Sequence, residues 1–213
     1  MSRPLSHIVS AIFHPFFFPT YATLMVIYMH PYRYRSYDEA YTYMILGIIF
    51  LLTFIFPALS LVVMRGVDLI KSFRLEERKQ RYIPYITGAL FYLLAFLMFK
   101  PGSTTQIQDV IITRMMFGGV LTIFGCMIIN LNLKVSLHTT AAAAMVGLIL
   151  YSAPGSFFNM EMPFLLSILI AGLVGTARLS LNAHEPREVY VGYLVGIFSM
   201  FLAFRTELVS LFY

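Results

Sequence analysis

Seven long apolar stretches, separated by short polar segments, make up most of this chain. They cover approximately residues 8–29, 41–64, 83–99, 110–133, 137–153, 162–177 and 189–204. Most of them approach the roughly 20 residues that an α-helix needs to cross a bilayer, so the pattern predicts an all-α, polytopic transmembrane helical bundle of about six to seven spans. Because the loops are too short to fold separately, we expect a single domain over residues 1–213.

The first apolar stretch contains His14-Pro15 and Pro19, which predict a kink or a re-entrant turn. His14 is expected to be a satisfied core histidine or part of this kink. No small-residue cleavage site follows the first residues, so the stretch is interpreted as a span and not as a signal peptide. Later spans carry Gly147, Gly172 and Gly175, which favour close packing of helices.

Composition excludes several other classes of protein. Of the 213 residues, 59% are hydrophobic and only 12% are charged, which is too little charge for an ordinary soluble domain. The formal net charge is +5, but there is no soluble basic face for nucleic acid, so the expected partners are membrane lipids and a phosphorylated substrate. The single cysteine, Cys126, lies in an apolar stretch and cannot form an internal disulfide.

The polar residues gather in three clusters, at 65–82, 134–138 and 178–188. Two spans separate each cluster from the next, so all three are predicted to lie on the same side of the membrane. With seven spans, the N-terminus lies on that side and the C-terminus on the other. Ionisable groups next to hydrocarbon are costly, and a convergent set of them indicates a functional site.

The third cluster contains Arg178, His184 and Glu188. If residues 184–188 are helical, His184 and Glu188 lie on one face, where a carboxylate can fix the imidazole tautomer and raise the nucleophilicity of the other ring nitrogen. The Arg178 guanidinium is suited to hold phosphate oxygens. The alternative is a boundary loop whose long side chains reach to water and whose surface pair is incidental.

The second cluster contains Ser136 and His138, just before and just inside an apolar run. Ser136 is either the N-cap of a helix or part of a phosphate site at the helix N-terminus. His138 is a candidate to protonate a leaving oxygen, or is an interfacial histidine. Lys134 is either an anion clamp or a positive flank of a span.

The first cluster is basic. Lys71 and Arg78 are seven residues apart, as are Arg74 and Arg81, so each pair is predicted to form one helical face. These side chains are candidates to bind phosphate. Basic loops of this kind also set topology or contact lipid headgroups, and that alternative stays open for each residue.

Taken together, the three motifs resemble the type 2 phosphatidic acid phosphatase family over about residues 65–200. That family carries Lys-x6-Arg-Pro, then Pro-Ser-Gly-His, then Ser-Arg-x5-His-x3-Asp. The third motif is matched best, by Ala177-Arg178-x5-His184-x3-Glu188, and the second partly, by Ser136-Leu137-His138. The first is matched loosely by Lys71 and Arg78, with Lys79 in place of proline; Arg78 and Arg81 ahead of Pro84 are the alternative registration.

The resemblance implies a role for each candidate. His184 attacks phosphorus and forms a phosphohistidine, Glu188 orients His184, and His138 protonates the leaving group. No metal and no cofactor is implied, because fixed cations neutralise the phosphoryl charge. The implied substrate is a lipid phosphate or diphosphate, of the polyprenyl diphosphate or phosphatidyl phosphate type. The implied phosphate-binding residues are Arg178, Ser136, Lys71, Arg74, Arg78 and Arg81.

Several functions remain in competition with lipid phosphate hydrolysis. A non-catalytic phospholipid-binding or transport protein would use the same cationic pocket, a structural protein would use the charges for topology, and a transferase would pass the phosphoryl group to another acceptor. We expect an integral protein of a bacterial cytoplasmic membrane. More basic residues lie on the side of the three clusters, which favours a cytoplasmic site. If Lys71, Arg74, Arg78, Arg81 and Arg178 are set aside as phosphate-binding residues, both sides carry equal numbers of basic residues, so the orientation stays open.

Overall fold

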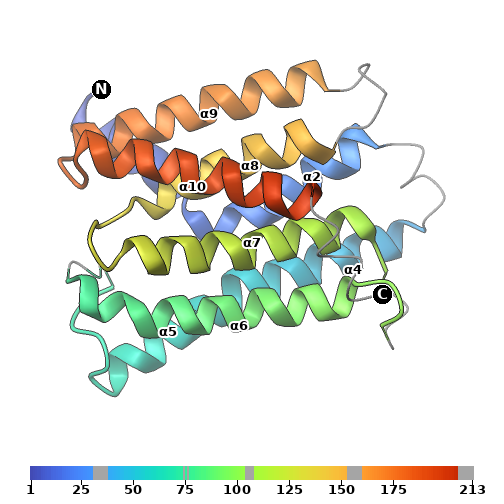
Figure 1. The fold of residues 1–213 in the computed structure, drawn as a ribbon, viewed down its shortest axis with the longest axis horizontal. Helices are drawn as coiled ribbons and strands as arrows, with labels where there is room; N and C mark the ends of the chain where they lie inside the picture. The colour runs from blue at the N-terminus through green and yellow to red at the C-terminus, as the bar shows by residue number, and fades with distance from the viewer. Residues whose placement is uncertain (31–37, 74, 76, 104–107, 153–159, 206–213) are drawn as a thin grey trace.

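The computed structural model describes the chain except residues 31–37, 74, 76, 104–107, 153–159 and 206–213. The described residues form helices and loops and no strand. Six helical segments are long and apolar enough to cross a membrane, and a seventh apolar helix, Leu137–Ser152, is shorter. The prediction of an all-α bundle of six to seven spans is therefore confirmed, and the helices lie roughly side by side along one axis (Figure 1).

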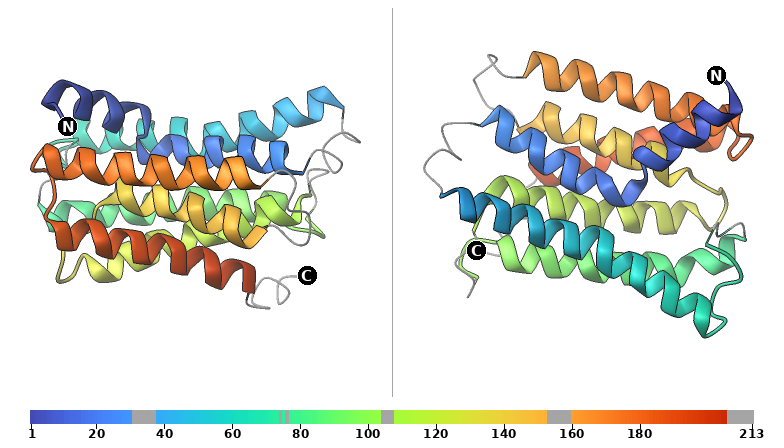
Figure 2. Two further views of the ribbon diagram at one scale, coloured as in Figure 1. Left: turned by 90° about the horizontal axis from the view of Figure 1, so that it is seen from above. Right: turned by 180° about the vertical axis from the view of Figure 1, so that it is seen from behind.

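The first span is broken where the sequence predicts a kink. It consists of α1 (Arg3–Ile12), the 3-10 turn η1 (Pro15–Phe17) and α2 (Phe18–Met29). Nδ1 of His14 accepts a hydrogen bond of 3.4 Å from the backbone N–H of Phe16, so His14 caps the turn that follows the break. As a result α1 runs at an angle to α2, which is visible from behind the molecule (Figure 2).

The second and third spans enclose the basic loop. The second consists of α4 (Glu39–Phe50), the π-helical turn η2 (Leu51–Ile55) and α5 (Phe56–Gly66); η3 (Arg78–Arg81) and α6 (Tyr82–Phe99) form the third. Pro57 has no N–H to donate to the turn before it, which accounts for the widened turn at η2. The described residues between Gly66 and Arg78 are not helical, so the predicted helical face of Lys71 and Arg78 is wrong.

The central helix of the bundle is α8 (Leu137–Ser152), between α7 (Val110–Ile129), α9 (Glu161–Ser180) and α10 (Pro186–Arg205). Most of α8 is buried, and α10 packs closely on it. A Cβ atom at Gly196 would collide with the backbone of Thr140 and Ala144. The closeness of α8 and α10 therefore depends on small residues at the interface, as in many membrane helix pairs.

The glycines named from the sequence behave differently from one another. Gly147 faces Ile197 and Met200 of α10, and Gly175 faces Tyr193, so both allow close packing as predicted. Gly172 faces open space, so the prediction is wrong for that residue.

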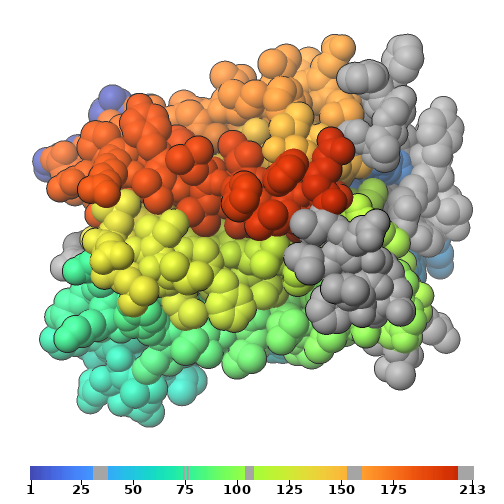
Figure 3. Space-filling model, viewed as in Figure 1, coloured from blue at the N-terminus to red at the C-terminus, as the bar shows by residue number. Residues whose placement is uncertain are grey.

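The three polar clusters lie at one end of the bundle. The α5–η3, α7–α8 and α9–α10 connections all turn at the end where the N-terminus lies, and α10 ends at the other end (Figures 1 and 2). Along the outer face, α7 and α10 lie against each other (Figure 3). Large apolar side chains such as Ile128, Leu194 and Phe198 are exposed on these two helices, as expected for a surface that faces lipid.

Candidate active site

His184 and Glu188 form a close, buried polar pair at the N-terminal end of the bundle. Nδ1 of His184 lies 2.7 Å from Oε2 of Glu188, and only 6% and 13% of the two side chains are exposed. The carboxylate accepts the Nδ1–H, which leaves a lone pair on Nε2. This is the arrangement of a nucleophilic or basic imidazole held by an orienting carboxylate.

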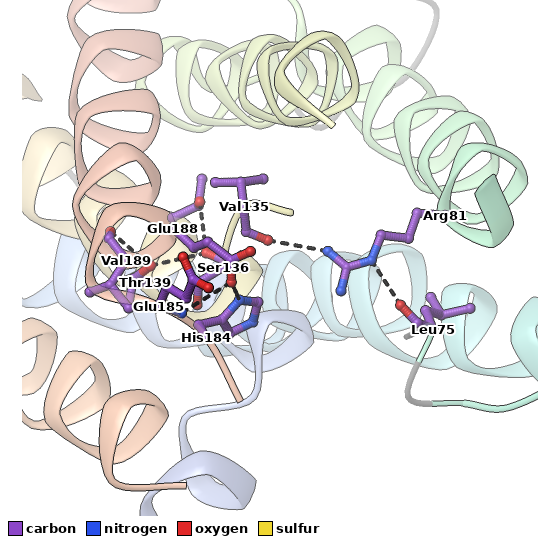
Figure 4. Close-up of polar contacts among 10 residues, drawn as sticks. Leu75, Arg81, Val135, Ser136, Thr139, His184, Glu185, Glu188 and Val189 are labelled. Carbon is purple, nitrogen blue, oxygen red and sulfur yellow. Dashed lines mark hydrogen bonds and ion pairs between the residues drawn. The ribbon is translucent and has the colours of Figure 1, made fainter. Parts of the chain in front are cut away.

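The pairing does not arise in the way that the spacing predicts. Helix α10 begins at Pro186, so His184 precedes the helix. Glu188 occupies the third helical position, and its Oε2 also accepts the backbone N–H of Glu185 at 3.2 Å, which is one half of a capping box. Proline at the first helical position suits such a start. The beginning of the helix thus fixes the carboxylate that orients His184 (Figure 4).

The end of α9 brings Arg178 to the same place. The N–H of Asn182 bonds the carbonyl of Leu179, and the N–H of Ala183 bonds the carbonyl of Arg178. Asn182 has a φ of 52°, so the chain leaves α9 through a left-handed residue. This tight reversal, followed at once by Pro186, explains how one short connection can hold both an arginine and a histidine at the site.

Burial and the positive charge of Arg178 lower the pKa of His184, and the Glu188 carboxylate acts in the opposite direction. Burial is the largest of these causes. The imidazole is therefore neutral at pH 7, which is the form that carries a lone pair.

Arg178 has a single side-chain partner among the described residues. Its Nη1 donates a hydrogen bond of 3.3 Å to the hydroxyl of Ser10 in α1, and its buried Nε has no partner in the described part of the chain. A guanidinium with no carboxylate against it and an unsatisfied N–H is prepared to receive an anion.

Ser136 lies directly before α8 and is fully buried. Its N–H bonds the carbonyl of Glu188, and its own carbonyl accepts from the hydroxyls of Thr139 and Thr140. Its hydroxyl, however, has no hydrogen-bond partner among the described residues. Ser136 therefore does not cap α8 through its side chain, and the alternative of a simple cap serine is wrong. An orphaned buried hydroxyl at a helix N-terminus is consistent with a missing ligand.

His138, in the first turn of α8, faces the N-terminal span. Its Nε2 lies 3.2 Å from the carbonyl oxygen of Ser10, and its ring meets that of His14 edge to face at 5.3 Å. Donation from Nε2 to this carbonyl leaves the lone pair on Nδ1. Both His138 and Arg178 are thus bonded to the same residue of α1.

The basic cluster divides into residues near the site and residues away from it. Nζ of Lys71 forms an exposed ion pair with Glu77 at 2.9 Å, and this hydrogen bond lowers the pKa of Glu77. Arg78 is also exposed, and its Nη1 donates to the carbonyl of Leu131. The structure brings neither side chain to the His184 pair, and Arg74 lies outside the described residues.

Arg81 is the buried member of the basic cluster, with 6% of the residue exposed. Its Nε donates to the carbonyl of Leu75 at 2.9 Å, and its Nη1 donates to the carbonyl of Val135 at 3.2 Å. Figure 4 shows its guanidinium pointing toward Val135 and the group around Ser136 and His184. The geometry favours the registration of the first motif that ends at Arg81.

Sequence reasoning missed two contributors, Ser10 and the contact of His14 with His138. Ser10 looks like one small residue of an apolar span. Only the break at Pro15, which tilts α1 against α9, brings it to Arg178. Of the described His, Cys, Asp and Glu residues, no group of three or more is placed to hold a metal ion.

Next to Arg81 a largely apolar cavity of about 170 Å³ opens into the bundle. Its walls come from η1, α2, α5, α6, α7 and α8, and include Phe16, Tyr85, Tyr92 and Met145. A second, open pocket of about 540 Å³ lies over His184 and Glu188 and is lined also by Lys134. The site thus has one face open to the outside and one face toward the interior of the bundle.

Residues 126–210 match the family model of the PAP2 superfamily. This match confirms the resemblance suggested by the motifs. The PAP2 segment contains the second and third motifs, with Ser136, His138, Arg178, His184 and Glu188. Members of the PAP2 superfamily are phosphoesterases, so the match supports phosphatase activity on phosphate esters. No curated protein and no solved structure matches the chain.

Proposed function

We propose that the protein is an integral membrane phosphatase that hydrolyses a lipid phosphate or diphosphate, of the polyprenyl diphosphate or phosphatidyl phosphate type. One observation carries the proposal: the buried His184–Glu188 pair leaves a lone pair on Nε2, at the end of the bundle that also holds Arg178 and Arg81, for which the described residues provide no carboxylate partner. A neutral nucleophile beside uncompensated cations is suited to attack a phosphorus that carries negatively charged oxygens.

The reaction follows from these groups. Nε2 of His184 attacks phosphorus and forms an N–P bond while the P–O bond to the lipid breaks. The positive charge that develops on the imidazole is stabilised by Glu188, which keeps its hydrogen bond to Nδ1. A water molecule then attacks the phosphohistidine, the N–P bond breaks, and inorganic phosphate leaves. Arg178 and the hydroxyl of Ser136 would bind the phosphoryl oxygens throughout.

His138 is the proposed proton donor to the leaving oxygen. In the structure its Nε2 is bonded to the carbonyl of Ser10. For this role His138 must first take up a proton on Nδ1, and the bond to Ser10 must open, so that Nε2–H of the imidazolium reaches the lipid oxygen and the neutral imidazole remains.

The cavity next to Arg81 supports a lipid substrate. Its lining is mostly apolar, and its size is comparable to cavities that hold a small hydrocarbon. A lipid tail can enter this space while the phosphate stays among the polar groups. With fixed arginines at the phosphate, the proposed reaction needs no metal. The single-domain organisation and the bacterial cytoplasmic membrane stay predictions.

Phosphate release by the purified protein, measured against a panel of lipid phosphates and diphosphates, tests the proposal. We expect turnover by the wild type, none by His184→Ala, and an acid-labile phosphoryl group on the wild-type protein during turnover. Equal turnover by His184→Ala would remove the mechanism. Binding of lipid phosphate without any release would indicate a transport or binding protein instead.

A further inference from the structure

The apolar cavity is a narrow slot that runs along the bundle. Its lining covers one side of three helical segments, residues 81–92 on η3 and α6, 115–126 on α7 and 137–148 on α8. Each segment advances about 11 residues along its helix, so the slot is about 16 Å long. A volume of about 170 Å³ over this length leaves room for one hydrocarbon chain and not for two.

The mouth of the slot is at the candidate active site. Arg81 lines the slot, and its Nη1 donates to the carbonyl of Val135, directly before Ser136. Leu137, directly after Ser136, lines the slot as well. A chain attached to a phosphate at Ser136 therefore has direct access to the slot.

The short hydroxyl side chains along the slot already have hydrogen-bond partners. The hydroxyls of Thr53, Ser60, Thr122 and Thr140 each donate to a backbone carbonyl three or four residues earlier in the chain. These bonds are local to each helix, and they leave the hydroxyls without a free hydrogen to offer to a ligand. The slot is therefore suited to hydrocarbon and not to water or to a polar tail.

The slot is closed at the end away from the site. Tyr92 of α6 and Met200 of α10 line this end. The glycines at 118–119 of α7 make room for both, because a Cβ atom at either position would collide with one of these two side chains. One turn further along the same helical faces, Phe96 of α6 and Ile112 of α7 are fully buried in the core. A chain that enters at the site thus ends against Tyr92 and Met200.

We propose that the slot selects substrates by the length of a single hydrocarbon chain, and that Tyr92 and Met200 set the upper limit. The inference rests on the proposed function and narrows its substrate class to lipid phosphates with one chain. A chain up to the length of the slot is buried along its whole length, and a longer chain meets the closed end. The second chain of a diacyl lipid has no space in the slot.

The test uses n-alkyl phosphates of increasing chain length on the protein held in an amphipathic polymer, at concentrations at which each phosphate is monomeric. Each methylene that passes from water into the slot is expected to raise kcat/KM about 4-fold. The rise should stop at one chain length, the break, where the chain reaches the closed end. A steady rise over the whole series, or no rise at all, would overturn the proposal.

Two variants should move the break in opposite directions. Tyr92→Ala opens the closed end and should move the break to chains about two to four methylenes longer. Gly88→Leu fills the middle of the slot and should move the break to shorter chains, and a Cβ atom at Gly88 makes only an ordinary contact of 3.7 Å with Ile123. Leu93→Ala is the matched control, because Leu93 is next to Tyr92 on α6 but exposed, and its break should match that of the wild type. A break that neither slot variant moves, or that the control moves equally, would overturn the proposal.

A binding measurement separates this proposal from the proposed function. The affinities of n-alkyl phosphonates, which have no P–O bond to the chain and are not hydrolysed, are measured by calorimetry over the same chain lengths. If the affinity shows the same break and the variants move it, but no lipid phosphate is turned over, the slot stands and the enzymatic function fails. If lipid phosphates are turned over but the affinity does not depend on chain length, the slot fails alone.

Discussion

Oε2 of Glu188 accepts a hydrogen bond from Nδ1 of His184 at 2.7 Å, and the same oxygen accepts the backbone N–H of Glu185. One carboxylate oxygen therefore both starts α10 and orients the imidazole. The resemblance places aspartate where this chain has glutamate. From the third helical position, the extra methylene of Glu188 lets it reach back to a residue that precedes the helix. The longer acid fits this local geometry.

We expect Glu188→Gln to lower kcat by about 10²- to 10⁴-fold, because an amide cannot stabilise the positive imidazole and can hold the wrong tautomer. The amide can still accept from the Glu185 N–H, so the thermal midpoint should change little. Phosphate release and thermal unfolding of the same preparation check both parts. Glu161→Gln, at the other end of α9, is the matched control. A kcat within about 3-fold of the wild type would show that Glu188 serves only the helix start.

The pH dependence of activity follows from the lowered pKa of His184. Burial and Arg178 hold this pKa below the ordinary value of 6.5, so the imidazole keeps its lone pair as the pH falls through 6.5 and gains a proton only at lower pH. The acidic limb of kcat/KM should therefore be centred below pH 6.5. In Glu188→Gln, which removes the group that raises this pKa, any residual activity should show the limb at still lower pH. A limb above pH 6.5 in the wild type would contradict the assignment.

Much of this architecture could be predicted from the sequence, because burying apolar helices in a bilayer leaves few alternatives. The number of spans predicts that the three clusters lie at one end of the bundle. In the structure they are connected by two hydrogen bonds, from Arg81 to the carbonyl of Val135 and from the N–H of Ser136 to the carbonyl of Glu188. The details that the sequence predicted wrongly, or not at all, depend on tertiary contacts. Ser136 has the sequence of a capping serine, yet its hydroxyl has no hydrogen-bond partner among the described residues, and its backbone N–H is bonded across to Glu188 of α10. Ser10 could not be found, since its role depends on the angle of α1.

The basic loop offers a direct test of which registration of the first motif is used. Arg81 is buried against two backbone carbonyls, whereas Lys71 is exposed and paired with Glu77. Arg81→Lys keeps the positive charge but loses the planar guanidinium with its several N–H donors, and should raise KM by about 10-fold. Lys71→Ala should change KM by less than about 2-fold, since exposed ion pairs contribute little. Steady-state kinetics on one lipid substrate gives both values, and the reverse ranking would restore the registration that begins at Lys71.

The α8–α10 contact is expected to be sensitive to a single methyl group. In Gly196→Ala the new Cβ would meet the backbone of Thr140 and Ala144, neither of which can move aside like a flexible side chain. We expect a loss of about 1–3 kcal/mol in stability, and reduced activity because Ser136 shifts relative to Glu188. Gly172→Ala is the matched control, since nothing lies within 4 Å of a Cβ there. Thermal midpoints of the two variants in detergent test this prediction, and equal midpoints would contradict the close contact between α8 and α10.

Ser10 is bonded to two groups of the candidate site. Its hydroxyl accepts from Arg178 and its carbonyl accepts from His138. Ser10→Ala removes the first bond and keeps the second, so Arg178 becomes available to an anion without first breaking a bond. We expect vanadate, which mimics a phosphoryl group in transfer, to inhibit Ser10→Ala at about 2- to 10-fold lower concentration. Ser6→Ala is the control, because Ser6 is buried one turn earlier on α1 and, among the described residues, its hydroxyl bonds the carbonyl of Ser2 and not a group of the site. Weaker inhibition of Ser10→Ala would mean that the hydroxyl positions Arg178 for the anion and does not compete with it.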